Sequence, residues 1–171
     1  LDSEGISEQQ LQQHRDSNTP PPMAGALLKN EQDMHFFERL MQMARDNGCD
    51  IKLIQLADTM GWANPLSIRC LVGMVQDRWP AQRINLHLHD TRGLGLANAF
   101  AAMEMGVDDF DSAVGGLGGC PYAGFKDAPG NITTEDLVHL CQEIGVETGI
   151  DLPRLLEVAR EAEKIFGRPL P

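Results

Sequence analysis

The sequence predicts an α/β fold built on a parallel sheet, and three observations lead to this prediction. Short apolar runs alternate with longer segments in which apolar residues recur at helical spacing. Strands that alternate with helices of about 10–15 residues are typical of βαβ units, whose strands lie parallel. Each apolar run also leads into polar residues, as expected where functional residues follow the carboxyl ends of parallel strands.

The regular part of the chain begins with a helix and a strand. Apolar residues recur at helical spacing from Glu31, and Gly48 suits the position just after a helix. The apolar run 51–56 then predicts a strand that ends at Asp58. Residues 1–30, which are rich in Gln, Ser and Pro, predict a tail or linker with at most a short polar helix before its proline run.

The second helix and strand have clear boundaries. Asn64 and Pro65 predict a helix start, because Asn caps helices and Pro fits the first turn. Pro80 stops this helix after Trp79, and the run 84–89 predicts the second strand.

The remaining elements follow the same alternation. A helix is predicted over 94–105, a third strand over 109–114 and a glycine-rich loop over 115–130. Thr133, with an acidic residue three positions later, predicts the start of a helix that ends near residue 145. Asp151 predicts the cap of the last helix.

The composition excludes several classes of protein. The chain has 171 residues, with 14 Lys or Arg and 25 Asp or Glu, so its formal net charge is −11. So acidic a chain is poorly suited to binding the phosphate backbone of nucleic acids. No run of about 18 uncharged apolar residues is present, so no transmembrane helix is expected. The length suits one domain.

The cysteines give no sign of a structural metal or redox pair. Cys49, Cys70, Cys120 and Cys141 form no C-x-x-C motif, so neither a zinc ribbon nor a thioredoxin-type site is expected. The chain begins at Leu1 without the basic and apolar segments of a signal peptide. We therefore expect a reducing compartment.

His87 and His89 are the strongest indication of a functional site. Residues i and i+2 of a strand point to the same face, so the two imidazoles share one face while Ile84, Leu86 and Leu88 fill the other. Two adjacent imidazoles could bind one divalent cation, and a hydrogen-bonded pair of structural histidines is the alternative. At the end of a strand in a parallel sheet, we favour the metal.

Other polar residues at the strand ends have two interpretations each. Asp58 could bind substrate, orient a ligand or act as a base, or it could cap a helix or order a loop. The amide oxygen of Asn131 could complete a metal shell, or the residue could serve as a helix cap or turn. Asp90 and Thr91 are expected to support the ligands or to cap the next helix.

The run GGLGGCPY at 115–122 predicts a flexible loop that carries the thiol of Cys120. Its glycines would let the backbone fold closely over a ligand or move as a lid. A phosphate-binding turn is the alternative, but neither a helix start at the required spacing nor a Walker Lys-Ser/Thr pair follows. Cys120 could act as an acid or base, or serve as a redox-sensitive thiol.

These segments together resemble the 3-hydroxy-3-methylglutaryl-CoA lyase family. The resemblance lies in LADTMG at 56–61, HLHDT at 87–91, GLGGCPYA at 116–123, GN at 130–131 and TEDL at 134–137, which occur in family order. It implies a (β/α)₈ barrel, and because a complete barrel takes about 250 residues, the chain would hold only its last three βα units and C-terminal helices.

The resemblance also implies an activity and a set of site residues. The activity is cleavage of 3-hydroxy-3-methylglutaryl-CoA to acetyl-CoA and acetoacetate with Mg²⁺ or Mn²⁺. His87, His89 and Asn131 would bind the metal, and Cys120, Asp58 and His87 would take part in catalysis. The substrate would be an acyl-CoA, and the compartment would be the bacterial cytoplasm or, in a eukaryote, the mitochondrial matrix.

The sequence departs from the family in one respect. The similarity covers roughly 46–169, whereas the family's first strand, which supplies an Asp ligand and an Arg that faces the developing enolate, has no counterpart here. Two imidazoles and one amide carry no negative charge and should hold a hard cation weakly. We therefore expect the isolated chain to be inactive or nearly so, and to pair through its sheet edges with a missing N-terminal half-barrel or another copy of itself.

Two further functions stay open. A Claisen-condensing synthase for isopropylmalate, citramalate or homocitrate would share the barrel and the H-x-H pair, but typically has Asn where this chain has Asp90 and lacks the Gly-Gly-Cys-Pro loop. A non-catalytic truncated remnant, or half of a split barrel, is the other alternative. Acetoacetate release would support the lyase, whereas CoA release from acetyl-CoA and a 2-oxo acid would support the synthase.

Overall fold

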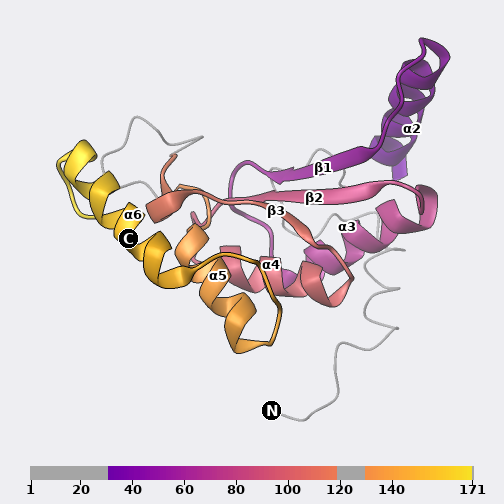
Figure 1. Ribbon diagram of the computed structural model, residues 1–171. Helices are drawn as coiled ribbons and strands as arrows, with labels where there is room; N and C mark the ends of the chain where they lie inside the picture. The colour runs from indigo at the N-terminus through magenta and orange to yellow at the C-terminus, as the bar shows by residue number, and fades with distance from the viewer. Residues whose placement is uncertain (1–30, 119–129, 171) are drawn as a thin grey trace.

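The computed structural model describes residues 31–118 and 130–170, and the tail 1–30 and the loop residues 119–129 lie outside the described part. The elements occur in the order α2 (Glu31–Asp46), β1 (Leu53–Asp58), α3 (Pro65–Arg78), β2 (Arg83–Leu88), α4 (Gly95–Glu104), β3 (Asp109–Asp111), the 3₁₀ turn η1 (Val114–Gly116), α5 (Thr134–Glu143) and α6 (Leu152–Phe166). The three strands form one parallel sheet in the order β1-β2-β3, which confirms the predicted βαβ alternation (Figure 1).

The register of the sheet fixes which side chains share a face. β1 pairs with β2 from Leu53 opposite Arg83 to Asp58 opposite Leu88. β2 pairs with β3 over three positions, the last of which places His87 opposite Asp111. Because successive residues of a strand point to opposite faces, the face that carries His87 is separate from the face that carries Leu88.

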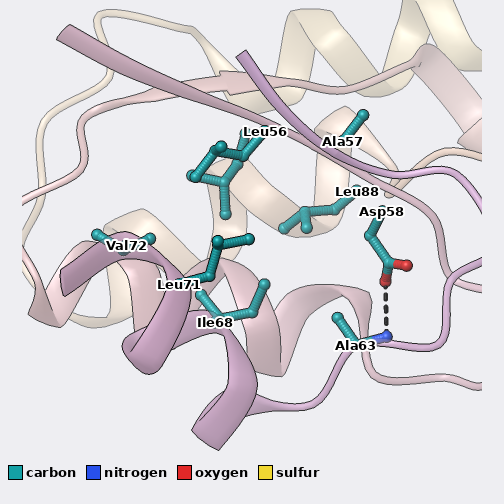
Figure 2. A pocket seen from close by; sticks show the side chains of 9 residues that line it. Leu56, Ala57, Asp58, Ala63, Ile68, Leu71, Val72 and Leu88 are labelled. Atoms are coloured by element: carbon teal, nitrogen blue, oxygen red, sulfur yellow. Dashed lines mark hydrogen bonds between the residues drawn. The ribbon is translucent and has the colours of Figure 1, made fainter. Parts of the chain in front are cut away.

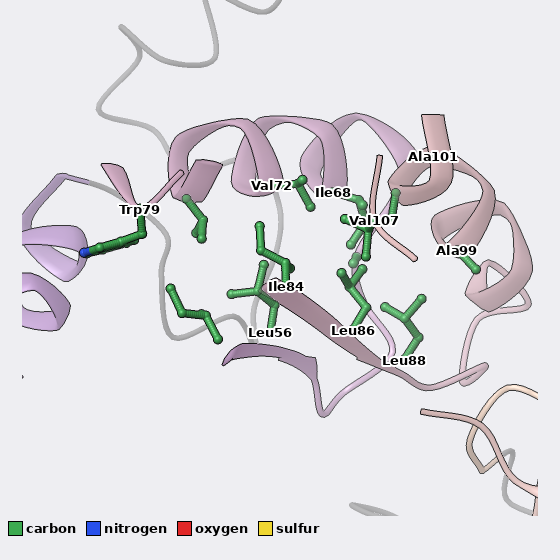
Figure 3. Packing of buried hydrophobic residues seen from close by; sticks show 14 of the residues in the cluster. Leu56, Ile68, Val72, Trp79, Ile84, Leu86, Leu88, Ala99, Ala101 and Val107 are labelled. Carbon is green, nitrogen blue, oxygen red and sulfur yellow. The ribbon is translucent and has the colours of Figure 1, made fainter. Parts of the chain in front are cut away.

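The apolar face of the sheet packs against the helices that connect its strands. Ile84, Leu86 and Leu88 of β2 are buried, as predicted, and Ile54 and Leu56 of β1 lie beside them in register. Figure 3 shows Leu56, Leu86 and Leu88 directed toward the connecting helices. α3 and α4 contribute apolar side chains that include Ile68, Val72, Ala99 and Ala101. Burying a Leu or Ile side chain contributes about 1.5–3 kcal/mol, so this face holds the sheet and the helices together.

The ends of the helices follow the predicted capping residues. Asn64 and Ser67 form a reciprocal capping box at the start of α3. The Thr133 side chain accepts a hydrogen bond from the backbone of Asp136 at the start of α5. Asp151 caps α6 in the same way.

The third strand is shorter than predicted, and the reason lies in the glycines that follow it. β3 ends at Asp111 instead of continuing to Val114, because Ala113 pairs with Thr133 and the chain turns into η1 at Val114. Gly115 and Gly116 have φ values of 57° and 59°, a left-handed conformation that glycine adopts without steric cost. The apolar Val114 thus belongs to a turn, which the pattern of apolar residues in the sequence does not predict.

None of the helices in the described ranges combines the length and the apolar character that crossing a membrane requires.

Candidate metal centre

The two histidines lie together at the carboxyl end of β2, as predicted. Their ring centroids are 4.9 Å apart and their planes are inclined by 67°. The His87 side chain keeps 31% of its surface exposed, whereas His89 keeps only 3%. His89 comes directly after the strand and forms an isolated antiparallel bridge with Asn131, which brings the third predicted ligand beside it.

His89 is oriented by the chain that leaves β1. Its Nδ1 lies 3.1 Å from the backbone oxygen of Asp58. A carbonyl oxygen only accepts hydrogen bonds, so Nδ1 carries the proton and Nε2 keeps a lone pair. Burial lowers the pKa of His89, an effect that the bond to Asp58 partly offsets and the neighbouring His87 reinforces. The neutral imidazole that a metal requires is therefore the favoured form.

His87 is oriented by a carboxylate on the neighbouring strand. Its Nδ1 lies 3.0 Å from Oδ2 of Asp111 on β3. An ionised carboxylate also only accepts, so Nδ1 donates, and Nε2 keeps a lone pair in the neutral form of this ring. The two rings thus offer two lone pairs from one strand end.

Asn131, the bridge partner of His89, offers a side-chain oxygen. Its Nδ2 donates to the backbone oxygen of Leu117 at 2.9 Å, which fixes the direction of the amide. Its Oδ1 is buried and has no hydrogen-bond partner in the part of the chain that the structure describes. A buried acceptor without a partner costs about 1–3 kcal/mol, which a ligand at this position would recover. Because Thr133 caps α5, the helix-cap interpretation of Asn131 does not hold.

These donors fit a divalent cation. Two imidazole nitrogens and one amide oxygen are ligand types that divalent metals accept in proteins. Within residues 31–118 and 130–170, no group of three or more His, Cys, Asp or Glu side chains could hold a metal. A carboxylate ligand, which the resemblance places on the first strand of the family's barrel, is therefore not supplied by the described residues.

Asp58 lies on the other face of the sheet. It is opposite Leu88 in the register and only 7% exposed. Its two carboxylate oxygens accept hydrogen bonds from the backbone nitrogens of Trp62 and Ala63, at 3.0 and 2.9 Å. Figure 2 shows the bond to Ala63. Of the interpretations open at the sequence level, this geometry favours the loop carboxylate. The backbone oxygen of Asp58, not its side chain, accepts the hydrogen bond from His89.

The small cavity beside Asp58 cannot hold a substrate. It has a volume of about 20 Å³ and is lined by apolar side chains of β1, β2 and α3, including Leu56, Ile68 and Leu86 (Figure 2). Such a volume accommodates about one water molecule. The histidine face is therefore the candidate site.

Cys120 lies outside the described residues, but the start of its loop is anchored at Asn131. Asn131 donates a hydrogen bond to the backbone oxygen of Leu117. The backbone of Gly118 also lies so close to Asn131 that a Cβ placed on Gly118 would be only 2.7 Å from Asn131 Nδ2. Glu135, 9% exposed, accepts the backbone N–H of Gly115 with both carboxylate oxygens, each at 3.0 Å. The loop thus begins in contact with the candidate ligand.

Two carboxylates that contact His87 or the start of the glycine-rich loop were missed by the sequence reasoning. Glu135 stood within the TEDL segment without a role, and Asp111 was counted only as part of a strand. The sequence contains a pattern that could have identified Asp111. Asp109 and Asp111 alternate along β3 as Asn85 and His87 do along β2, which predicts polar neighbours on one face. Asp90 behaves as expected, since its Oδ1 accepts the N–H of Gly95 at 2.7 Å at the start of α4.

Comparison with known proteins identifies the family. The family model HMGL-like matches residues 22–161. The chain belongs to the HMGL-like family.

Its relatives include lyases that act on two acyl-CoA thioesters. The chain is 50% identical over 118 residues to an (R)-citramalyl-CoA lyase of Chloroflexus aurantiacus, covering 69% of this chain and 37% of the relative. It is 43% identical over 121 residues to a hydroxymethylglutaryl-CoA lyase of Bacillus subtilis, covering 71% and 40%. The family to which this chain belongs thus includes lyases of acyl-CoA thioesters.

Solved structures of the family agree with the fold. The HMG-CoA lyase of Bacillus subtilis superimposes with a TM-score of 0.71 at 38% identity, covering 81% of this chain and 45% of that one. An HMG-CoA lyase of Acinetobacter baumannii, solved with coenzyme A and 3-methylmalate, gives a TM-score of 0.69 at 43% identity, covering 84% and 45%. The predicted partial (β/α)₈ barrel is confirmed, and the chain spans less than half the length of these relatives.

Proposed function

We propose that this chain carries the histidine and asparagine ligands of a divalent-metal-dependent lyase that cleaves a 3-hydroxy-3-methylacyl-CoA, with 3-hydroxy-3-methylglutaryl-CoA as the substrate. The observation that carries the proposal is the arrangement at the end of β2. His87 and His89 both make their hydrogen bonds through Nδ1, which leaves Nε2 of each neutral ring for a metal. The amide oxygen of Asn131, the bridge partner of His89, is buried without a partner among the described residues.

The chemistry needs a site that handles oxygen atoms and protons. Cleavage must remove the proton of a tertiary hydroxyl and release a thioester enolate. A divalent cation bound here would polarise the hydroxyl and lower its pKa. His87, His89 and Asn131 would hold the cation and set its position. Cys120, on the loop that begins against Asn131, would exchange protons with the substrate as an acid or base.

The choice of substrate rests on one methylene group. 3-Hydroxy-3-methylglutaryl-CoA and citramalyl-CoA share the tertiary alcohol and a free carboxylate, and the first has one more methylene between them. A pocket separates such substrates by only about 1–3 kcal/mol, so related lyases can differ in preference. The products separate them cleanly, because cleavage releases acetoacetate in one case and pyruvate in the other, with acetyl-CoA in both.

Activity would require barrel strands beyond those described here. The described residues supply no carboxylate to the candidate centre, and two imidazoles with an amide should hold a hard cation weakly. We therefore expect the isolated chain to bind Mn²⁺ weakly and to turn over little substrate. An N-terminal half-barrel would supply the missing ligand. The relatives cited above are lyases, which favours cleavage over a condensing synthase.

The test combines metal binding with product analysis. Mn²⁺ affinity of the 171-residue chain is measured by electron paramagnetic resonance, with His89→Gln as the ligand variant and His35→Gln, at an exposed position on α2, as the matched control. We expect only His89→Gln to lose binding. The chain is then mixed with the N-terminal half of the Bacillus subtilis relative and supplied with both thioesters. Acetoacetate release supports the proposal. Pyruvate release alone would reassign the substrate, and equal Mn²⁺ binding by His89→Gln would refute the site.

A further inference from the structure

The face of the sheet that carries His87 also carries polar side chains from all three strands, and these form one connected network. The register aligns Gln55, Asn85 and Asp109 in one row, and places His87 opposite Asp111 in the next. Gln55 Nε2 donates to Asn85 Oδ1 at 2.8 Å. Asn85 Nδ2 donates to Asp109 Oδ1 at 3.0 Å. All three strands therefore contribute to the network.

The Asp111 carboxylate is the point where this network reaches the candidate metal centre. Its Oδ2 accepts from Gln55 Nε2 at 2.8 Å and from His87 Nδ1 at 3.0 Å. Its Oδ1 accepts from Asn85 Nδ2 at 3.1 Å. Donors on β1 and β2 thus hold the Asp111 carboxylate in one orientation, although the Asp111 side chain is 44% exposed.

We propose that Asp111 is a positioning residue, held by Gln55 and Asn85, that keeps the proton of His87 on Nδ1 and directs the Nε2 lone pair toward the metal. The inference rests on the proposed function, because it takes His87 as a metal ligand. A histidine ligand has two tautomers, and the group bonded to one nitrogen decides which nitrogen is left for the metal. Removing such a partner typically lowers metal affinity by about 10–100-fold.

Asp109 provides a matched control. It lies on the same strand and the same face, two residues from Asp111, and shares the Asn85 amide as a partner. Its other carboxylate oxygen accepts from Arg83 at 3.0 Å. The structure shows no bond from Asp109 to His87, so Asp109→Ala removes a carboxylate from the same network without touching the ligand.

The experiment reads the tautomer of His87 directly. ¹⁵N-labelled wild type, Asp111→Ala and Asp109→Ala are compared by long-range ¹H–¹⁵N NMR at about pH 8.5, where an imidazole of ordinary pKa is neutral. We expect His87 to carry its proton on Nδ1 in the wild type and in Asp109→Ala, and to shift toward the Nε2–H form in Asp111→Ala. Mn²⁺ affinity should fall by about 10–100-fold in Asp111→Ala alone.

The outcomes separate this inference from the proposed function. Wild-type protein with the proton on Nε2 of His87 overturns the inference even if Asp111→Ala fails to fold. An unchanged tautomer in folded Asp111→Ala, or the same change in Asp109→Ala, also overturns it. If the wild type binds no Mn²⁺ while the tautomer responds only to Asp111→Ala, the proposed metal site fails and the positioning of His87 by Asp111 stands.

Discussion

Replacing Asp58 by Asn separates its two interpretations, because the side chain and the backbone of this residue face different structures. The carboxylate holds the backbone nitrogens of Trp62 and Ala63 on the helix-facing side of the sheet. The backbone oxygen receives the Nδ1 proton of His89. Asp58→Asn changes the first set of contacts and leaves the second in place.

The expected loss follows from the geometry of the amide. Asn has only one acceptor oxygen, so its NH₂ group must face one of the two backbone N–H groups. Loss of one hydrogen bond to a buried charged group costs about 1.5–3 kcal/mol. For a chain of this size, about 1 kcal/mol shifts the melting temperature by roughly 2–4 °C. We expect the melting temperature of Asp58→Asn to fall by roughly 3–12 °C, and its Mn²⁺ affinity to stay near that of the wild type.

Thermal unfolding by circular dichroism and Mn²⁺ titration together measure both effects. Asp90→Asn is the matched control, because the Asp90 side chain accepts one backbone N–H, from Gly95, and an amide oxygen can keep that bond. It should therefore melt close to the wild type. If Asp58→Asn kept its melting temperature and lost Mn²⁺ affinity, the carboxylate would belong to the site, and the loop role assigned here would be refuted.

Three further perturbations test the site and its surroundings. Gly118→Ala places a Cβ 2.7 Å from Asn131 Nδ2 and should therefore weaken Mn²⁺ binding. Gly145→Ala is the control, because Gly145 is also at positive φ but has no neighbour within 4 Å. It should lose only stability, by about 1–2 kcal/mol. Because burial depresses the pKa of His89 in the folded chain, the unfolded chain binds more protons. Urea unfolding should therefore show stability falling as the pH drops below about 6.5, with a shallower fall in His89→Gln. Mn²⁺ at about 100 times its dissociation constant should add about 2.7 kcal/mol of stability, which a chelator should remove; equal melting with and without the metal would contradict this.

Much of the fold could be predicted because local signals and periodicity agree. The capping residues Asn64 and Thr133 mark helix starts by a mechanism that acts within a few residues. The alternation of Leu86, His87 and Leu88 predicts which side chains face the core. The end of β3 was not predictable in the same way, because the left-handed turn at Gly115 overrides the apolar character of Val114.

In the candidate site, too, the features that depend on nearby residues could be predicted and those that depend on distant residues could not. The pairing of His87 with His89 depends on spacing within one strand, so the sequence predicts it and the ring contact confirms it. The orientation of each ring depends on another strand, through Asp111 for one and the Asp58 backbone for the other. Partners that lie 24 and 31 residues away in the sequence require the sheet register, which composition and periodicity do not contain.

Strand alternation also explains why stability and chemistry should be separable in this chain. On β2, Leu86 and Leu88 are each 1% exposed, so replacing either by Ala should cost about 2–5 kcal/mol. His87, between them, faces the polar network and is part-exposed, so its replacement removes little buried apolar surface. β2 thus packs against the helices with every second residue and presents His87 on the opposite face. Replacing His87 should therefore lower Mn²⁺ affinity while costing the fold much less stability than replacing Leu86 or Leu88.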